Sequence, residues 1–226
     1  PNSAVEKNFG TAFIDDKYIK EPEKALKLSK QEIERLSEIV SDVVKDSINA
    51  LKTRHEIVID KIKYKCSQIS HLVDEIIPYI TKVGQNELTK KQSERETMLL
   101  YIVADFEQIA DVINRNIIYI SQEKMRRHLR FSDEGLKDIK YLHNVVYTNC
   151  SKIIDSFIEE NEALAREVSD DIDKLNEIMH ELKRNHIARL HAGLQESIDT
   201  SSLHLDVLDQ YMKINERKGL ESLDCL

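Results

Sequence analysis

The sequence predicts an all-α protein made of two tandem three-helix bundles. The chain has only 5 Gly and 3 Pro among 226 residues, too few for the tight turns of a sheet sandwich, a barrel or a doubly wound fold. It has no Trp, while 33% of its residues are charged and 41% are hydrophobic. Hydrophobic residues recur at steps of three and four along several long segments, which indicates amphipathic helices that each bury one face.

An extended lead-in, residues 1–19, is expected before the first helix because it shows no helical period. The run Glu21-Pro22-Glu23 then predicts a helix start, since proline suits the first turn and acidic side chains stabilise the positive end of the helix dipole. An apolar stripe follows from Ala25 to Leu51. This helix opens a first bundle that we assign to residues 20–130.

Two further helices complete the first bundle. One is expected from His55 to Val83, with Gly84 as its C-terminal cap. The other is expected from Leu88 to Leu129, with a break near Ser121. A basic run, residues 124–130, lies at its end, where cations favour the negative end of the dipole. Contact with an anion or a lipid headgroup is the alternative use of that run.

The second bundle is assigned to residues 131–226. Ser132 followed by Asp133 and Glu134 predicts a capped helix start and marks the clearest boundary in the chain. Gly193 interrupts the last connection. Two halves of similar length with the same element order suggest an internal duplication. The three expected helices cover residues 133–160, 162–192 and 197–218.

Charge and composition exclude several classes of protein. The net charge of −8 argues against general nucleic-acid binding, which needs a basic face. The longest apolar run, residues 98–104, is far shorter than the roughly 20 residues that cross a bilayer. Cys66, Cys150 and Cys225 are scattered and odd in number, which predicts reduced thiols and a cytoplasmic location. No phosphate loop or nucleophile motif is present, so we expect no enzyme.

One acidic pair in the third predicted helix is a candidate metal site. Glu107 and Asp111 are four residues apart and share one side of a helix, at the edge of its apolar face. Like charges at this spacing repel each other, and a hard cation with oxygen ligands would remove that cost. The alternative is that Arg115, four residues further on, neutralises Asp111 and the pair forms only a solvated edge.

Histidines in the predicted fifth helix do not suggest a shared metal ion. His180, His186 and His191 are spaced so that their side chains point in different directions, and we interpret them as surface or polar-edge residues. Glu177 and His180 fit the Glu-x-x-His pattern of a di-iron carboxylate protein. The second such motif that a di-iron site requires is absent from the sequence.

Several segments resemble a known family. The run Asp105 to Asp111, DFEQIAD, resembles the DLERIGD motif of PhoU-type phosphate-uptake regulators. Further segments are similar to the cytoplasmic PhoU-like domain of bacterial sodium/phosphate cotransporters: residues 14–16, 22–26, 131–136 and 184–190. The resemblance covers most of the chain, from about residue 13 to residue 218, and it implies two tandem three-helix repeats.

The resemblance also implies metal ligands. In the second repeat, Met212 takes the place of the first acid of the motif and Glu216 that of the last. Where the family has a further acidic pair, the second repeat has Ser169 and Asp173, and the first repeat has two residues without a carboxylate, Cys66 and Ser70. A divalent or iron-type ion of unknown identity would therefore use the acids that remain: Glu107, Asp111, Asp173 and Glu216.

The function that this resemblance implies is non-enzymatic regulation of phosphate transport and homeostasis. The chain would bind a phosphate transporter or a sensor kinase and would contact the membrane only through such a partner or through a transmembrane cotransporter half. It would then work in the cytoplasm, including the inner face of the membrane, with a homodimer as one possible assembly and without nucleic acid. The second repeat lacks some of the acids of the motif, which leaves another hypothesis open. In that hypothesis the chain is an acidic helical scaffold or dimerisation module with no metal and no phosphate role.

Overall fold

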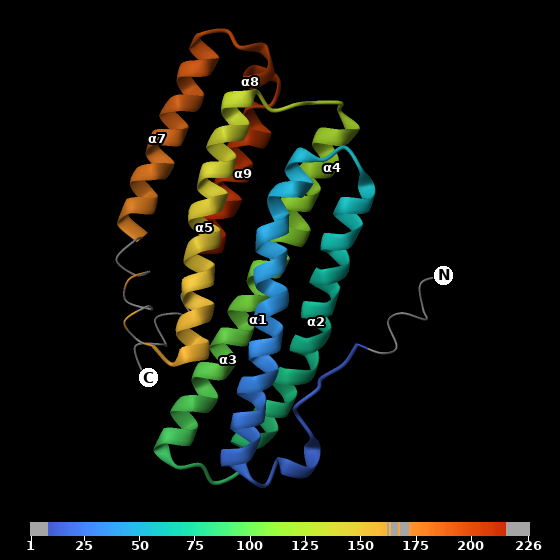
Figure 1. The fold of residues 1–226 in the computed structure, drawn as a ribbon, viewed down its shortest axis with the longest axis vertical. Helices are drawn as coiled ribbons and strands as arrows, with labels where there is room; N and C mark the ends of the chain where they lie inside the picture. Colours follow the sequence, from blue (N-terminus) through green and yellow to red (C-terminus); the bar gives the residue numbers. More distant parts are fainter. Residues whose placement is uncertain (1–8, 162, 164–166, 168–171, 216–226) are drawn as a thin grey trace.

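Long helices lying side by side make up the computed structural model, which describes residues 9–161, 163, 167 and 172–215. The helices follow the long axis of an elongated molecule, and no strand occurs among these residues (Figure 1). The all-α prediction is confirmed. In chain order the helices are α1 (Pro22–Lys52), α2 (Glu56–Gly84), α3 (Lys90–Asp111), α4 (Ile118–Arg126), α5 (Asp133–Glu159), α7 (Ile172–His191), α8 (Gln195–Asp199) and α9 (Ser201–Asn215).

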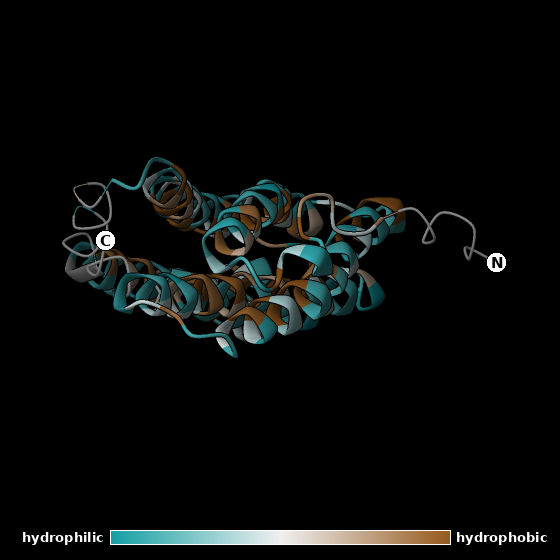
Figure 2. Ribbon diagram, turned by 90° about the horizontal axis from the view of Figure 1, so that it is seen from below, coloured by the Kyte–Doolittle hydropathy of each residue, from teal (hydrophilic) through white to brown (hydrophobic). Residues whose placement is uncertain are grey.

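The first group of helices consists of α1, α2 and α3, each of which packs on the other two. The predicted apolar stripes supply the core between them. Seen along the helices, hydrophobic residues turn toward the inside of the bundle and hydrophilic residues toward its outside (Figure 2). Residues of this core with no exposed surface include Leu36, Val43, Ile69, Ile76 and Leu99.

The start of the chain is bound to this group. Residues 9–15 form no regular element, whereas Asp16–Tyr18 form a short 3-10 turn, η2, within the lead-in that was expected to be extended. Asp15 caps this turn by accepting a hydrogen bond from the Lys17 backbone. Proline stands at the first position of α1, as predicted.

The end of α2 differs slightly from the prediction. Gly84 is the last helical residue, and Gln85 takes the C-cap position with right-handed backbone angles. Gly84 therefore has no left-handed cap role. A Cβ at this position would meet the carboxylate of Glu96 on α3, which is the flexible end of that side chain and can move aside.

The third predicted helix changes geometry earlier than expected. α3 passes into a π-helical segment, η3 (Val112–Ile117), and then into α4, so the predicted break near Ser121 is wrong. Ser121 is helical and buried, and its hydroxyl donates to the Ile117 carbonyl at 2.8 Å. A π-turn holds one residue more than an α-turn, so η3 rotates the residues after Asp111 relative to those before it.

The second group of helices begins where the sequence predicts. The Ser132 hydroxyl accepts the Gly135 backbone N–H at 3.1 Å and caps α5. α7 covers residues 172–191 of the predicted helix 162–192. Gly193 has a positive φ of 72°, which suits glycine and allows the turn after α7.

The last predicted helix, residues 197–218, is two helices in the structure. α8 ends at Asp199, Thr200 takes a non-helical conformation, and α9 follows from Ser201. Residues 216–218 lie outside the described part of the chain. The division arises at Thr200, whose buried hydroxyl donates to the Glu196 carbonyl at 2.6 Å and satisfies the end of α8 locally.

The two groups are joined by packing and by polar contacts. α1 packs on α5, and both η3 and α4 pack on α9. The hydroxyls of Ser47 on α1 and Tyr211 on α9 lie 3.0 Å apart in the core. Asn116 of η3 donates to the Gln210 side chain of α9 at 2.8 Å. Within the described residues no helix has both the length and the hydropathy to cross a membrane.

Candidate functional site

The acidic pair of the predicted metal motif lies at the end of α3. Glu107 and Asp111 are one helical turn apart, both are half-buried, and η3 follows directly after Asp111. Phe106, Ile109 and Ala110 beside them are buried in the core. The pair therefore occupies an edge between the apolar face of α3 and solvent.

Arg115 takes part in this edge. Its Nη2 lies 3.2 Å from Asp111 Oδ2, and the two side chains are 75% and 49% exposed, respectively. This is the ion pair that the alternative interpretation of the motif expected. Water screens such an exposed pair, so it is worth less than about 1 kcal/mol. A cation that binds Asp111 would displace Arg115 at little cost.

Cys66 of α2 is the buried neighbour of this edge. The pKa of its thiol is raised to about 12, first by burial and second by the negative charge of Asp111. Cys66 therefore stays protonated, and a protonated thiol is a poor metal ligand. Ser70, at the other position where the family motif has an acid, is exposed.

The donor set does not fit a metal cluster. In the part of the chain that the structure describes, no group of three or more His, Cys, Asp or Glu side chains could hold a metal ion. A hard cation prefers about six oxygen ligands. Glu107 and Asp111 offer two carboxylates, and Arg115 competes for one of them. A single cation completed by water is the most that these residues allow.

The predicted ligands of the second repeat fall outside the described side chains. Asp173 belongs to α7, but its side chain is outside them, as is the whole of Glu216. Met212 is buried, and Asn215 accepts a hydrogen bond from Asn149 at 2.9 Å in the core. The described end of α9 thus offers a thioether and an engaged amide, which suit a hard cation poorly.

A buried polar cluster that the sequence analysis missed lies where α7 and α9 meet the start of α5. His186 and His204 stack with ring centroids 4.6 Å apart, and each residue is only 1% exposed. His186 Nε2 is 2.9 Å from the Ser201 hydroxyl, and His204 Nε2 is 3.2 Å from the Gly135 carbonyl. The interpretation of His186 as a surface or polar-edge residue is wrong, because α9 covers it.

Both histidines of this cluster are held neutral. Burial, together with the nearby His186 and Arg189, lowers the pKa of His204 to about 3. Burial and Arg189 also lower the pKa of His186. Arg189 forms an ion pair of 2.7 Å with Asp138, whose own pKa is raised by burial despite this partner. The arrangement suits a structural polar core more than proton transfer near neutral pH.

One weak signal could have revealed this cluster. Gly135 stands within the first turn of α5, where glycine is unfavourable, and a Cβ there would lie 3.3 Å from His204 Cδ2. Its missing side chain leaves room for the imidazole. His180 and His191 are exposed, as expected.

Part of this bundle is similar to a known protein family. Residues 33–117, from within α1 to the last residue of η3, match the family described as the PhoU domain. The matched region includes both Glu107 and Asp111. The resemblance drawn from DFEQIAD is confirmed for the PhoU family, while the link to sodium/phosphate cotransporters stays a prediction.

Curated relatives of this chain carry the name "Putative inorganic phosphate export protein YjbB". The relative from Salmonella typhimurium is 26% identical over 137 residues, which cover 61% of this chain and 25% of the relative. The relative from Escherichia coli K12 is 24% identical over 155 residues, which cover 69% of this chain and 28% of the relative. The chain thus spans about a quarter of the length of these relatives.

A solved structure shares the fold. The crystal structure of PhoU from Pseudomonas aeruginosa superposes with a TM-score of 0.78 at 14% sequence identity, covering 90% of this chain and 95% of that one. Identity at this level shows the fold alone. The all-α fold is therefore shared with PhoU, while the functional prediction rests on the partial family match and on the names of the relatives.

Proposed function

We propose that this protein regulates phosphate transport by binding a transporter or a sensor kinase at the cytoplasmic face of the membrane. The match of residues 33–117 to the PhoU domain carries this proposal. The names of the curated relatives, which refer to inorganic phosphate export, support the phosphate link. A cotransporter half joined to this chain is one arrangement that would bring the bundle to the membrane.

The side of the bundle formed by α3, η3 and α4 is the face that we propose for partner binding. Tyr101 and Tyr119 on these elements are 56% and 62% exposed, so a bound partner would cover two large aromatic side chains there. Aromatic residues are enriched at protein interfaces because they bury much area with little loss of side-chain entropy. Glu107 and Asp111 lie between these two tyrosines along the chain.

The metal part of the proposal is a single divalent or iron-type cation on Glu107 and Asp111. The two carboxylates supply hard oxygen ligands at a half-exposed edge, and water would complete the coordination. A bound cation would remove the repulsion between the acids and stiffen the junction of α3 with η3. Asp173 and Glu216 stay predicted ligands of the second repeat.

The first experiment is elemental analysis of the untagged protein and of the double variant Glu107→Gln/Asp111→Asn. The control replaces Asp206, an exposed acid of α9, with Asn. Stoichiometric metal in the wild type and the control, lost in the double variant, supports the cation site. Metal retained by the double variant contradicts it.

The regulatory part of the proposal is tested in cells. Phosphate uptake and export are measured in a strain without the protein, complemented either by the wild type or by Tyr101→Ala/Tyr119→Ala. Flux should change on deletion and should not be restored by the double tyrosine variant. Unchanged flux on deletion contradicts the phosphate role.

A second candidate function is an acidic helical scaffold without metal. The ion pair between Asp111 and Arg115 favours it, because Asp111 already has a cationic partner. This hypothesis predicts no bound metal, no effect on phosphate flux, and a dimer in light scattering. The same preparations used for elemental analysis therefore discriminate between the two.

A further inference from the structure

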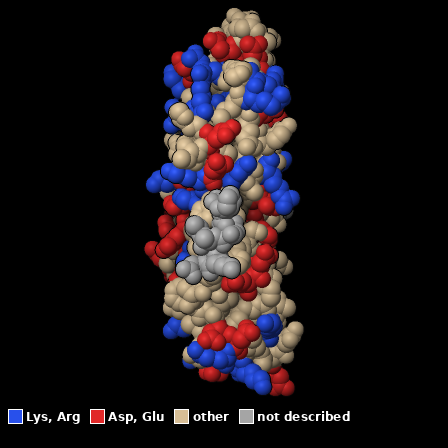
Figure 3. Space-filling view, turned by 90° about the vertical axis from the view of Figure 1, so that its right-hand side faces the viewer, with Lys and Arg blue, Asp and Glu red and all other residues tan. Residues whose placement is uncertain are grey.

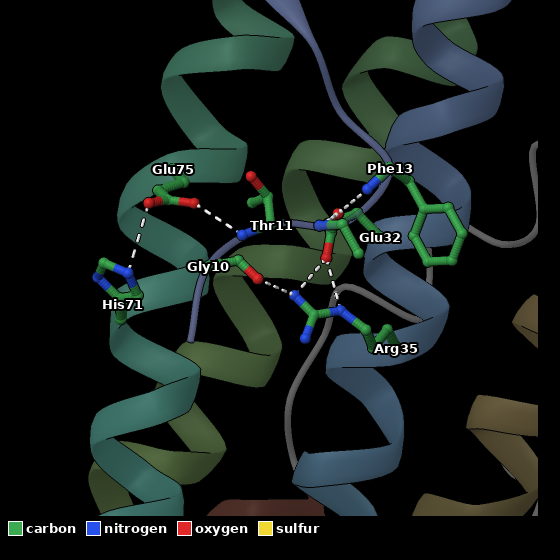
Figure 4. A network of polar contacts seen from close by, with 8 residues as sticks. Gly10, Thr11, Phe13, Glu32, Arg35, His71 and Glu75 are labelled. Atoms are coloured by element: carbon green, nitrogen blue, oxygen red, sulfur yellow. Dashed lines mark hydrogen bonds and ion pairs between the residues drawn. The ribbon is translucent and has the colours of Figure 1, made fainter. Parts of the chain in front are cut away.

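A fully buried carboxylate holds the start of the chain against the bundle. Glu32 of α1 is 0% exposed, and its Oε2 accepts the backbone N–H groups of Ala12 and Phe13, both at 2.7 Å (Figure 4). Its Oε1 accepts a hydrogen bond from Arg35 Nε at 2.7 Å. An ionised carboxylate is costly to bury unless such partners surround it. The burial of Glu32 therefore depends on these contacts.

Residues 9–15, which we call the N-terminal strap, lie between α1 and α2 (Figure 4). The Thr11 backbone donates to Glu75 Oε2 of α2 at 3.0 Å. The Gly10 carbonyl accepts from Arg35 Nη2 of α1 at 2.6 Å. Both helices thus contribute a carboxylate to the same short segment, and the contacts go to its backbone.

The contacts continue from the strap to the beginning of α1. The Tyr79 hydroxyl of α2 donates to the Asp15 carbonyl at 3.2 Å. The Asn86 side chain donates to the Ile19 carbonyl at 2.9 Å. The strap is therefore anchored along its length, which differs from a flexible linker with a solvated backbone.

We propose that the N-terminal strap is a rigid attachment that fixes the point at which any polypeptide joined before Phe9 meets the bundle. Its specific requirement is two successive backbone N–H groups, at Ala12 and Phe13, directed at Glu32. Only the use of this fixed point of attachment rests on the proposed function, since a transporter half would be such a polypeptide. Release of the strap would leave Glu32 with Arg35 and without its two amide donors.

Hydrogen exchange of the full chain tests this attachment. Two variants weaken it from opposite sides: Glu32→Gln removes the charged acceptor, and Ala12→Pro removes one amide donor while Glu32 stays intact. The matched controls are Glu38→Gln, an exposed glutamate on the same helix, and Ala12→Ser, which keeps the N–H. The Thr11 and Phe13 amides should exchange at least about tenfold faster in the two variants than in the wild type and the controls.

A spin label reports on rigidity directly. The label is attached to a cysteine introduced by Phe13→Cys, a position whose side chain is 40% exposed. The background carries Cys225→Ser, and the two remaining cysteines, Cys66 and Cys150, are buried thiols with raised pKa values. We expect a broad, immobilised spectrum that narrows when Glu32→Gln is added. Because Ala12→Pro leaves α1 unchanged, it keeps the test decisive if Glu32→Gln unfolds the protein.

Two results would overturn the proposal: strap amides that exchange in the wild type as fast as in an unstructured peptide, or exchange that neither variant accelerates. None of these measurements involves phosphate, metal or a partner. Failure of the attachment would therefore leave the regulatory proposal standing, and failure of the regulatory proposal would leave the attachment standing.

Discussion

Tyr211 of α9 and Ser47 of α1 place their hydroxyls 3.0 Å apart in the core, where helices from the two halves of the chain meet. The Tyr211 ring also packs edge-on against His143 of α5, with ring centroids 5.4 Å apart. One side chain thus contacts an element of each helix group. Burial raises the pKa of the Tyr211 hydroxyl, and its hydrogen bond to Ser47 only partly opposes that effect.

Removing the Tyr211 hydroxyl should weaken the junction measurably. Tyr211→Phe keeps the ring but loses the hydrogen bond to Ser47, which still bonds the Val44 carbonyl at 2.7 Å. We expect a loss of about 1 kcal/mol in the free energy of unfolding, measured by chemical denaturation. The exposed Tyr119→Phe serves as the control and should change nothing. A double-mutant cycle with Ser47→Ala that shows no coupling would contradict this reading.

Acid should destabilise the protein through the buried histidine pair. His204 has a pKa of about 3 in the folded protein against 6.5 for the free side chain, so the unfolded chain takes up the proton first as pH falls below 6.5. The stabilisation is complete above pH 6.5 and is lost at about 1.4 kcal/mol per pH unit below it, down to the folded pKa. Urea denaturation between about pH 7 and pH 5 measures this slope.

His204→Phe identifies the group responsible for that slope. The substitution removes the titrating ring, so unfolding should take up about one proton fewer and the unfolding free energy should depend less on pH. The lost contact with Gly135 lowers stability at every pH and does not change this slope. The exposed His180→Phe is the matched control and should leave the slope unchanged. An equal slope in the wild type and His204→Phe would refute the assignment.

The two buried cysteines should resist alkylation. The thiols of Cys66 and Cys150 both have a pKa raised to about 12 by burial, so almost no thiolate forms near neutral pH. At about pH 8 the thiolate fraction alone makes the reaction with iodoacetamide roughly a thousandfold slower than for a free cysteine. Peptide mapping after native and denatured labelling measures both sites. Rapid labelling of either cysteine in the native protein would contradict the burial of that side chain.

Arg115 should limit cation binding at the acidic edge. In Arg115→Gln, Asp111 loses its cationic partner, so titration with a divalent cation should show higher affinity than in the wild type. The free energy of unfolding should change by less than about 0.5 kcal/mol because both side chains are largely exposed. Arg127→Gln, which removes another exposed arginine of the same chain segment, is the control. Equal affinity in both variants would argue that Asp111 is not a ligand.

The starts of helices and their apolar faces were predictable because the residues that mark them are close together in the sequence. Pro22 at the first turn of α1 and the Ser132 cap of α5 act on their own neighbours in the chain, and both were identified from sequence. The π-helical segment was not, since the sequence around Asp111 carries no proline or glycine to mark it. Surface charge is mixed on the face seen in Figure 3, as the interspersed charges of the sequence suggest.

The sequence by itself determined the helical class, the main helix boundaries, the PhoU resemblance and the pairing of Asp111 with Arg115 as one alternative, because each depends on residues within a few positions of one another. Only the tertiary structure decided that Glu32 is buried beneath the strap and that His186 stacks on His204. A glutamate or histidine on a helix has the same local pattern whether water or another helix covers it. Burial and hydrogen-bond partners come from segments distant in sequence, and they are set when the helices pack.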